Sequence, residues 1–211
     1  ITLGPAQWRA VVIFGLCQNA LYLGLNFLAM QWIEASLAAI IASTMPLLVA
    51  AANWAYFRER LSALGVLGMV AGFSGVALIM GQRLGAGSDG LGVLLCLIGA
   101  VALSVATLAV RGASQDGKNL LLIVGLQMCV GGIILLPFAA LFEPVVVEMS
   151  PLLLAAFLYT TFVPGLLATF IWFVLVRRIG ATRAATYHFL NPVFGVGLAW
   201  LLLGEALRVS S

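Results

Sequence analysis

The sequence predicts an all-α integral membrane protein with an inverted repeat of five plus five transmembrane helices, of which seven are present in this chain. Three observations lead to this prediction: the composition, a series of long uncharged segments, and a motif that occurs twice at a fixed offset. Hydrophobic residues make up 64% of the 211 residues, and charged residues make up only 8%. A soluble domain of this size needs more charged residues to cover its surface.

The uncharged segments have the length of membrane-spanning helices. Each contains no Asp, Glu, Lys or Arg, and each is 19 to 25 residues long. About 20 apolar residues in a helix cross the hydrocarbon core of a bilayer. We therefore expect seven spans, namely Ala10–Met30, Ala35–Phe57, Ala63–Gly81, Gly90–Val110, Leu120–Leu141, Leu152–Val176 and Ala184–Leu203.

Basic residues are concentrated in alternate loops between these segments. One set of loops contains Arg9, Arg58, Arg60, Arg111, Lys118, Arg177, Arg178 and Arg183. The other set contains only Arg83 and Arg208. Cytoplasmic loops carry the excess of Lys and Arg. We therefore expect a multi-pass protein of the bacterial inner membrane with its Ile1 end in the cytoplasm.

Two stretches of the chain share a pattern at an offset of 146 positions. In Met45–Glu59 and again in Asn191–Glu205, a proline is followed by Trp after 8 positions and by Glu after 13. The alignment from Phe27 to Leu61 contains nine identities in 35 positions. By the loop charges, the first copy crosses the membrane from outside to inside and the second copy from inside to outside. The repeat is therefore inverted. An inverted repeat requires an odd number of helices in each unit.

The repeat sets the expected domain organisation. Residues 1–81 are expected to form the last three helices of the first repeat, and residues 82–89 a linker. Residues 90–211 are expected to form the first four helices of a truncated second repeat. Two further helices are then expected before Ile1 and one after Leu207.

Two stretches carry a resemblance to a known family. They read "NFLAMQWIEASLAAIIASTMPLLVAAANWAYFRERLS" and "FVLVRRIGATRAATYHFLNPVFGVGLAWLLLGEAL". They resemble matching parts of the two repeats in EamA-type members of the drug/metabolite transporter superfamily. The first copy departs from the family pattern, because Arg58 stands where the family usually has Gly. The resemblance implies ten helices, a central cavity, and export of a small molecule by alternating access, with substrates that include amino acids, nucleosides and sugars.

Polar and aromatic residues deep within the spans are the candidates for a substrate-binding cavity. Their spacing of i, i+3 and i+7 would place Asn19, Tyr22 and Asn26 on one helix face. For each asparagine, hydrogen bonding between helices is the alternative role. The candidate residues are Asn19, Tyr22, Asn26, Trp172, Tyr187, His188 and Asn191.

Two prolines are expected to bend their spans. Pro46 follows Ser43 and Thr44, and Pro192 follows Asn191. A proline removes one backbone hydrogen bond of a helix, which membrane helices tolerate where polar groups satisfy the freed carbonyl. Each bend is either a packed kink or a broken helix that lines a cavity near the middle of the membrane.

We therefore expect a transporter that exports a small organic metabolite, such as an amino acid, by alternating access about a central cavity. A channel and an intramembrane enzyme are the alternatives. The spans contain no nucleophile-and-base motif and no metal-binding motif, so neither enzymatic activity nor a catalytic residue, metal or cofactor is expected. The expected partners are a small-molecule substrate and the lipid bilayer, with no nucleic acid, and the protein is expected to be a monomer.

The expected orientation is testable by labelling single cysteines in a cysteine-free background. Cysteines introduced as Ser88→Cys and Met149→Cys should react with a membrane-impermeant thiol reagent added outside intact cells. A cysteine introduced as Ser114→Cys should react only after the membrane is permeabilised. The reverse pattern would contradict both the orientation and the inverted repeat.

Overall fold

The computed structural model describes residues 3–58, 63–84, 90–113, 119–142 and 148–203. Every regular element within these ranges is a helix. The helices form seven rods, where a rod is either one helix or a run of successive helical segments. The first, second, sixth and seventh rods each consist of two or three such segments. The prediction of an all-helical protein is confirmed.

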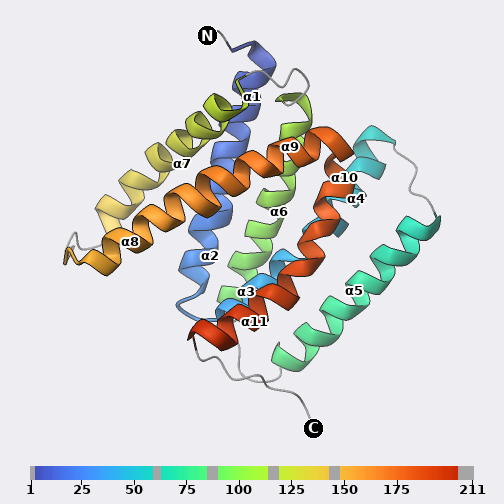
Figure 1. Ribbon diagram of the computed structural model, residues 1–211. Helices are drawn as coiled ribbons and strands as arrows, with labels where there is room; N and C mark the ends of the chain where they lie inside the picture. Colours follow the sequence, from blue (N-terminus) through green and yellow to red (C-terminus); the bar gives the residue numbers. More distant parts are fainter. Residues whose placement is uncertain (1–2, 59–62, 85–89, 114–118, 143–147, 204–211) are drawn as a thin grey trace.

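The first three rods come from the N-terminal part of the chain, and Figure 1 shows how they are placed. They are α1 (Pro5–Phe14), the π-helix η1 (Gly15–Leu23) and α2 (Gly24–Ala29); α3 (Ala35–Ala42) and α4 (Met45–Phe57); and α5 (Ala63–Leu84). The other four rods follow. They are α6 (Gly90–Ala113); α7 (Leu120–Phe142); α8 (Pro151–Thr160), the π-helix η2 (Thr161–Ala168) and α9 (Thr169–Ile179); and α10 (Ala181–Ala185), the 3₁₀-helix η3 (Thr186–Leu190) and α11 (Asn191–Leu203).

Five of the rods are long and apolar enough to cross a membrane. They comprise Pro5–Ala29, Ala35–Tyr56, Gly90–Val110, Leu120–Phe142 and Pro151–Ile179. These five correspond to predicted spans. The two remaining spans, Ala63–Gly81 and Ala184–Leu203, coincide with helical rods, and their passage through the membrane stays a prediction.

The helix α6 lies at the centre of the bundle and contributes to each of three buried apolar clusters. One cluster joins α6 to α1, α7, α9 and α10, through residues such as Phe14, Ala106 and Phe173. The second joins α6 to α2 and α3, and the third joins Leu103 of α6 to α4 and α10. The α6 side chains in these clusters are small or medium-sized, which lets neighbouring helices approach closely.

The element boundaries recur at the same offset of 146 positions as the sequence motif. Pro5 begins α1 and Pro151 begins α8, and each helix has 10 residues. The two π-helices begin at positions 15 and 161, and α3 and α10 begin at positions 35 and 181. The helices α4 and α11 begin at positions 45 and 191 and have 13 residues each. Figure 1 shows the α3–α4 rod and the α10–α11 rod running in opposite directions.

Both predicted prolines lie in the first turn of a helix, directly after a break in the rod. The α-helical pattern stops at Ala42 and resumes at Met45, so Pro46 occupies a position where its missing N–H is tolerated. At the break, the Ser43 hydroxyl donates to the Ile40 carbonyl at 2.5 Å, and the Thr44 hydroxyl donates to the Ile41 carbonyl at 2.8 Å. Pro192 has an equivalent position in α11, after the 3₁₀-helix.

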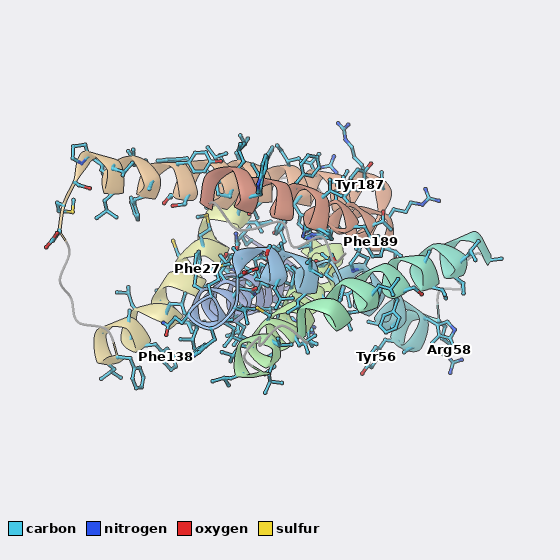
Figure 2. The ribbon with its side chains drawn as sticks, turned by 90° about the horizontal axis from the view of Figure 1, so that it is seen from below. Phe27, Tyr56, Arg58, Phe138, Tyr187 and Phe189 are labelled. Carbon is cyan, nitrogen blue, oxygen red and sulfur yellow. The ribbon has the colours of Figure 1, made fainter. Side chains whose placement is uncertain are left out.

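Two helix ends adopt backbone conformations that favour glycine. Arg58 follows the last residue of α4 with φ 53° and ψ 27°, in the left-handed region, and lies near Tyr56 (Figure 2). Gly180 joins α9 to α10 with φ 83° and ψ 159°, a region that only glycine enters readily. Glycine is the common residue at a left-handed helix end. The left-handed backbone at position 58 thereby explains why glycine would suit this position better than arginine.

These two ends should respond to substitution in opposite directions. Arg58→Gly should stabilise the protein by about 1 kcal/mol, because it removes the cost of a left-handed conformation for a residue with a side chain. Gly180→Ala should destabilise it for the same reason. The measurement is thermal unfolding of the purified protein in detergent.

Gly132→Ala in α7 is the matched control for Gly180→Ala. A Cβ atom there meets nothing within 4 Å, and alanine favours a helix over glycine. This variant should unfold at the wild-type temperature or above it. A lower unfolding temperature for Arg58→Gly would contradict the assignment of strain to Arg58.

Candidate functional site

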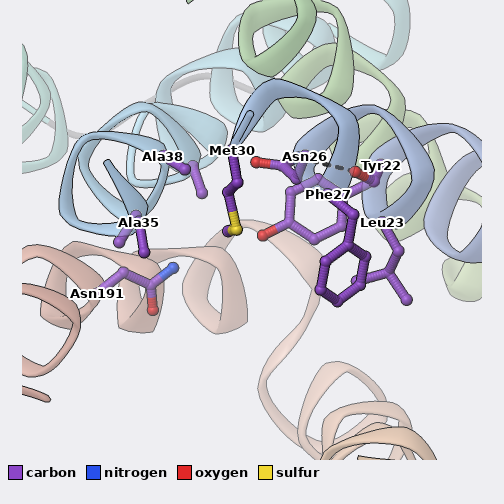
Figure 3. Close-up of a pocket in the computed structure, with 10 residues that line it drawn as sticks. Tyr22, Leu23, Asn26, Phe27, Met30, Ala35, Ala38 and Asn191 are labelled. Carbon is purple, nitrogen blue, oxygen red and sulfur yellow. Dashed lines mark hydrogen bonds between the residues drawn. The ribbon is translucent and has the colours of Figure 1, made fainter. Parts of the chain in front are cut away.

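A cavity of about 210 Å³ lies between the first rod, α3 and the first residue of α11. It is mostly apolar, with three polar side chains in its wall. Figure 3 shows the side chains that surround it. They are Tyr22, Leu23, Asn26, Phe27, Met30, Ala35, Ala38, Ala39, Ala42 and Asn191.

Asn26 is a fixed part of the cavity wall. Its side-chain nitrogen Nδ2 donates to the Tyr22 carbonyl oxygen at 2.7 Å, and its Oδ1 accepts from the Cys96 thiol at 3.3 Å. The side chain is only 7% exposed. Asn26 therefore both ties α2 to α6 and presents a small amide surface to the cavity.

Tyr22 is the aromatic side chain with a polar group in this wall. Its ring extends from the first rod toward Met30 (Figure 3). Within the described residues, its hydroxyl group has no hydrogen-bond partner, so both the donor and the acceptor are available to a ligand. Phe27, one turn further along, adds an apolar ring that is 69% exposed.

Asn191 belongs to a chain of three side chains in contact. Its Nδ2 lies 3.0 Å from Nδ1 of His188, so a hydrogen bond joins the amide to the imidazole ring. The Trp172 ring meets the imidazole edge-on, with 5.0 Å between ring centroids and an interplanar angle of 86°. Of the three, only Asn191 lines the cavity.

The two other predicted site residues lie elsewhere. Asn19 donates through Nδ2 to the Gln127 carbonyl oxygen at 3.0 Å and also to the Gln127 side-chain oxygen. It therefore contacts α7, whereas Tyr22 and Asn26 border the cavity. Residues at i, i+3 and i+7 share a face only in an α-helix, and η1 is π-helical, which alters the face that each residue occupies. Tyr187 is 55% exposed and does not line the cavity.

Sequence reasoning missed two groups of residues. The first comprises the apolar wall, including Phe27 and Met30, because only polar and deeply placed aromatic residues were selected. The second comprises Gln127 and Asn53, two amides with 0% and 1% exposure that join rods. Both are amides within predicted spans, and polar residues inside a membrane commonly have a functional or packing role, so the sequence contained a signal for them. Among the described residues, no three His, Cys, Asp or Glu side chains lie close enough to hold a metal ion.

Similarity to known proteins covers nearly the whole chain. The chain is 26% identical over 205 residues to the uncharacterised transporter YvbV of Bacillus subtilis, which is 96% of this chain and 67% of that protein. It is 24% identical over 201 residues to protein PecM of Dickeya dadantii, and the alignment covers 95% of this chain and 67% of that protein. The chloroplastic WAT1-related protein At3g02690 of Arabidopsis thaliana is 23% identical, with 96% of this chain and 51% of that protein covered.

The fold also matches a solved structure. A crystal structure with 23% sequence identity superposes with a TM-score of 0.71, covering 98% of this chain and 71% of that one. The sequence pattern of the EamA-like transporter family matches this chain over residues 1–81 and 90–211. Together with the five apolar rods, these findings identify a multi-pass membrane transporter. The chain belongs to the EamA-like transporter family.

Proposed function

We propose that the protein exports a small organic metabolite, such as an amino acid, across the bacterial inner membrane by alternating access. The observation that carries the proposal is the position of the cavity between α3 and the start of α11. These elements flank the breaks at the two prolines, and broken helices of related repeats commonly border the binding site in transporters. An apolar pocket with a few orienting polar groups is typical of a small-molecule site.

The proposed mechanism requires two units that rock against each other. Three observations support an inverted repeat: the sequence motif, the element boundaries at the same offset, and the opposite directions of the α3–α4 and α10–α11 rods (Figure 1). In an inverted repeat, the two units can exchange conformations, which opens the site first to one side and then to the other.

A carrier is favoured over the alternative of a channel. The cavity borders Met30 and Ala35 at one end of the second rod. Near the other end of that rod, Asn53 is buried and bonded to Thr182 of α10. A site that is open at one end and packed at the other suits alternating access.

The role of Tyr22 is testable with a matched tyrosine. Tyr22→Phe removes the hydroxyl group that faces the cavity and should raise the substrate concentration for half-maximal transport by about two- to tenfold, the range expected for one hydrogen bond. Tyr187→Phe removes an exposed hydroxyl outside the cavity and should have no effect. The measurement is counterflow of a panel of amino acids and related metabolites in proteoliposomes. Equal effects of the two variants would place the site elsewhere.

The contact between His188 and Asn191 predicts non-additive effects. His188→Phe keeps an aromatic ring against Trp172 but removes the nitrogen that holds the Asn191 amide. It should weaken substrate binding in the wild-type background and add little in the Asn191→Ala background, because coupled residues do not contribute independently. Half-maximal concentrations from counterflow measure both effects. Additive losses would show that His188 acts without Asn191.

The direction of transport has a separate test. Everted inner-membrane vesicles expose the cytoplasmic face, so an exporter should carry the substrate identified by counterflow into them. Right-side-out vesicles loaded with that substrate should release it faster when the protein is present. Net movement only in the opposite sense would contradict export.

A further inference from the structure

A buried hydrogen bond joins the two copies of the repeat near one end of the bundle. The Asn53 side-chain nitrogen, near the end of α4, donates to the hydroxyl oxygen of Thr182, near the start of α10, at 2.5 Å. The two residues are 129 positions apart, and Asn53 is only 1% exposed. Separating these helices would leave a buried amide without this partner, which is costly unless water replaces it.

This hydrogen bond and the cavity lie toward opposite ends of the second rod. Met30 and Ala35, which line the cavity, flank the turn that leads into α3, and Asn53 lies near the end of α4. Figure 1 shows α4 and α10 meeting at one end of the bundle and α2 and α3 meeting at the other. One end of the bundle is therefore held by this hydrogen bond, while the other end contains the cavity.

Equivalent residues of the repeat have different environments at these two ends. Phe27 lines the cavity and is 69% exposed, whereas its counterpart Phe173 is 1% exposed. The Phe173 ring packs edge-on against Phe14, with 5.0 Å between centroids. Phe27 and Phe173 are thus identical side chains at equivalent positions, but Phe27 is exposed at the cavity and Phe173 is buried in the core.

Two of the three alanines at the start of each rod follow the same division. Ala35 and Ala39 line the cavity and are partly exposed. Their counterparts Ala181 and Ala185 belong to buried apolar clusters and are at most 5% exposed. Ala38 also lines the cavity, but it is 3% exposed and belongs to a buried cluster, like its counterpart Ala184. The difference between the two ends therefore extends over several residues of each repeat.

We propose that the Asn53–Thr182 hydrogen bond is a latch that holds this end of the transporter closed and breaks in each transport cycle. The inference rests on the proposed alternating access. The positions equivalent to Asn53 and Thr182 are Ala199 and Ser36. Alanine has no side-chain donor, so position 199 cannot make the equivalent hydrogen bond to Ser36. The hydrogen bond consequently favours the resting state in which the cavity is open at the α3 end.

The test measures the accessibility of each end with single cysteines. In a background with Cys17→Ala, Cys96→Ser and Cys129→Ala, Val49→Cys reports on the closed end, because Val49 is fully buried one turn before Asn53. Met30→Cys reports on the cavity end. Thr182→Val removes the hydroxyl group and keeps the shape of the side chain. It should raise the rate at which the cysteine at position 49 reacts with a water-soluble maleimide by about tenfold, and lower the rate at position 30.

Ser104→Ala is the matched control. Ser104 is also buried, but its hydroxyl donates to the Ala100 carbonyl of its own helix at 2.8 Å. This variant should leave both reaction rates unchanged. An unchanged rate at position 49 in Thr182→Val would overturn the latch. An equal rise in Ser104→Ala would overturn it as well, since general loosening of the bundle would then be the cause.

A second experiment avoids any loss of folding in Thr182→Val. Asn53→Cys and Thr182→Cys, joined by a short reducible cross-linker, should stop counterflow, and reduction should restore it. Normal counterflow in the cross-linked protein would overturn the latch. If the wild-type protein shows no counterflow of any compound, the proposed function fails, while the rates at positions 30 and 49 still decide whether the latch exists.

Discussion

Close approach of helices to α6 is the constraint on which the rest of the structure depends. A Cβ atom on Gly92 would lie 2.8 Å from the Ile33 side chain, and one on Gly99 would lie 2.8 Å from Nδ2 of Asn26. In a membrane, lipid solvates apolar side chains as well as protein does, so dense packing and hydrogen bonds hold helices together. The missing side chains on α6 therefore fix α2 at the distance where Cys96 reaches Asn26.

Three asparagines within the rods show that structural and site roles are combined in this bundle. Asn19 bonds to α7, Asn53 bonds to α10, and Asn26 bonds to α6 while it also borders the cavity. An amide at membrane depth requires partners, and a neighbouring rod supplies at least one of them in all three cases. The same bonds set the distances between rods, so a polar residue in a span influences the cavity even when it does not line it.

Much of the fold was predictable because its signals are local in the sequence. Charge-free length predicted the spans, five of which meet the length and hydropathy of a membrane helix, and the Pro, Trp and Glu pattern gave the offset that the helix boundaries follow. The site was only partly predictable. Polarity and depth selected Tyr22, Asn26 and Asn191, which line the cavity, and also Asn19, which bonds to α7 because η1 is not a regular α-helix. Phe27 was missed because nothing local distinguishes an exposed cavity ring from a ring like Phe173, which packs in the core.

The π-helical segment Gly15–Leu23 makes the first rod sensitive to a change in its backbone hydrogen bonding. A π-helical segment accommodates an extra residue within an α-helix, so it sets the rotational phase of everything after it. Restoring α-helical bonding there without removing a residue would turn the following residues further around the rod axis, because each α-helical residue advances by about 100° and each π-helical residue by less. Asn19 would stay against α7, while Asn26 would leave both α6 and the cavity. Because η2 occurs at the equivalent place in the sixth rod, both rods depend on the same local deformation, although only Thr161–Ala168 contains a proline.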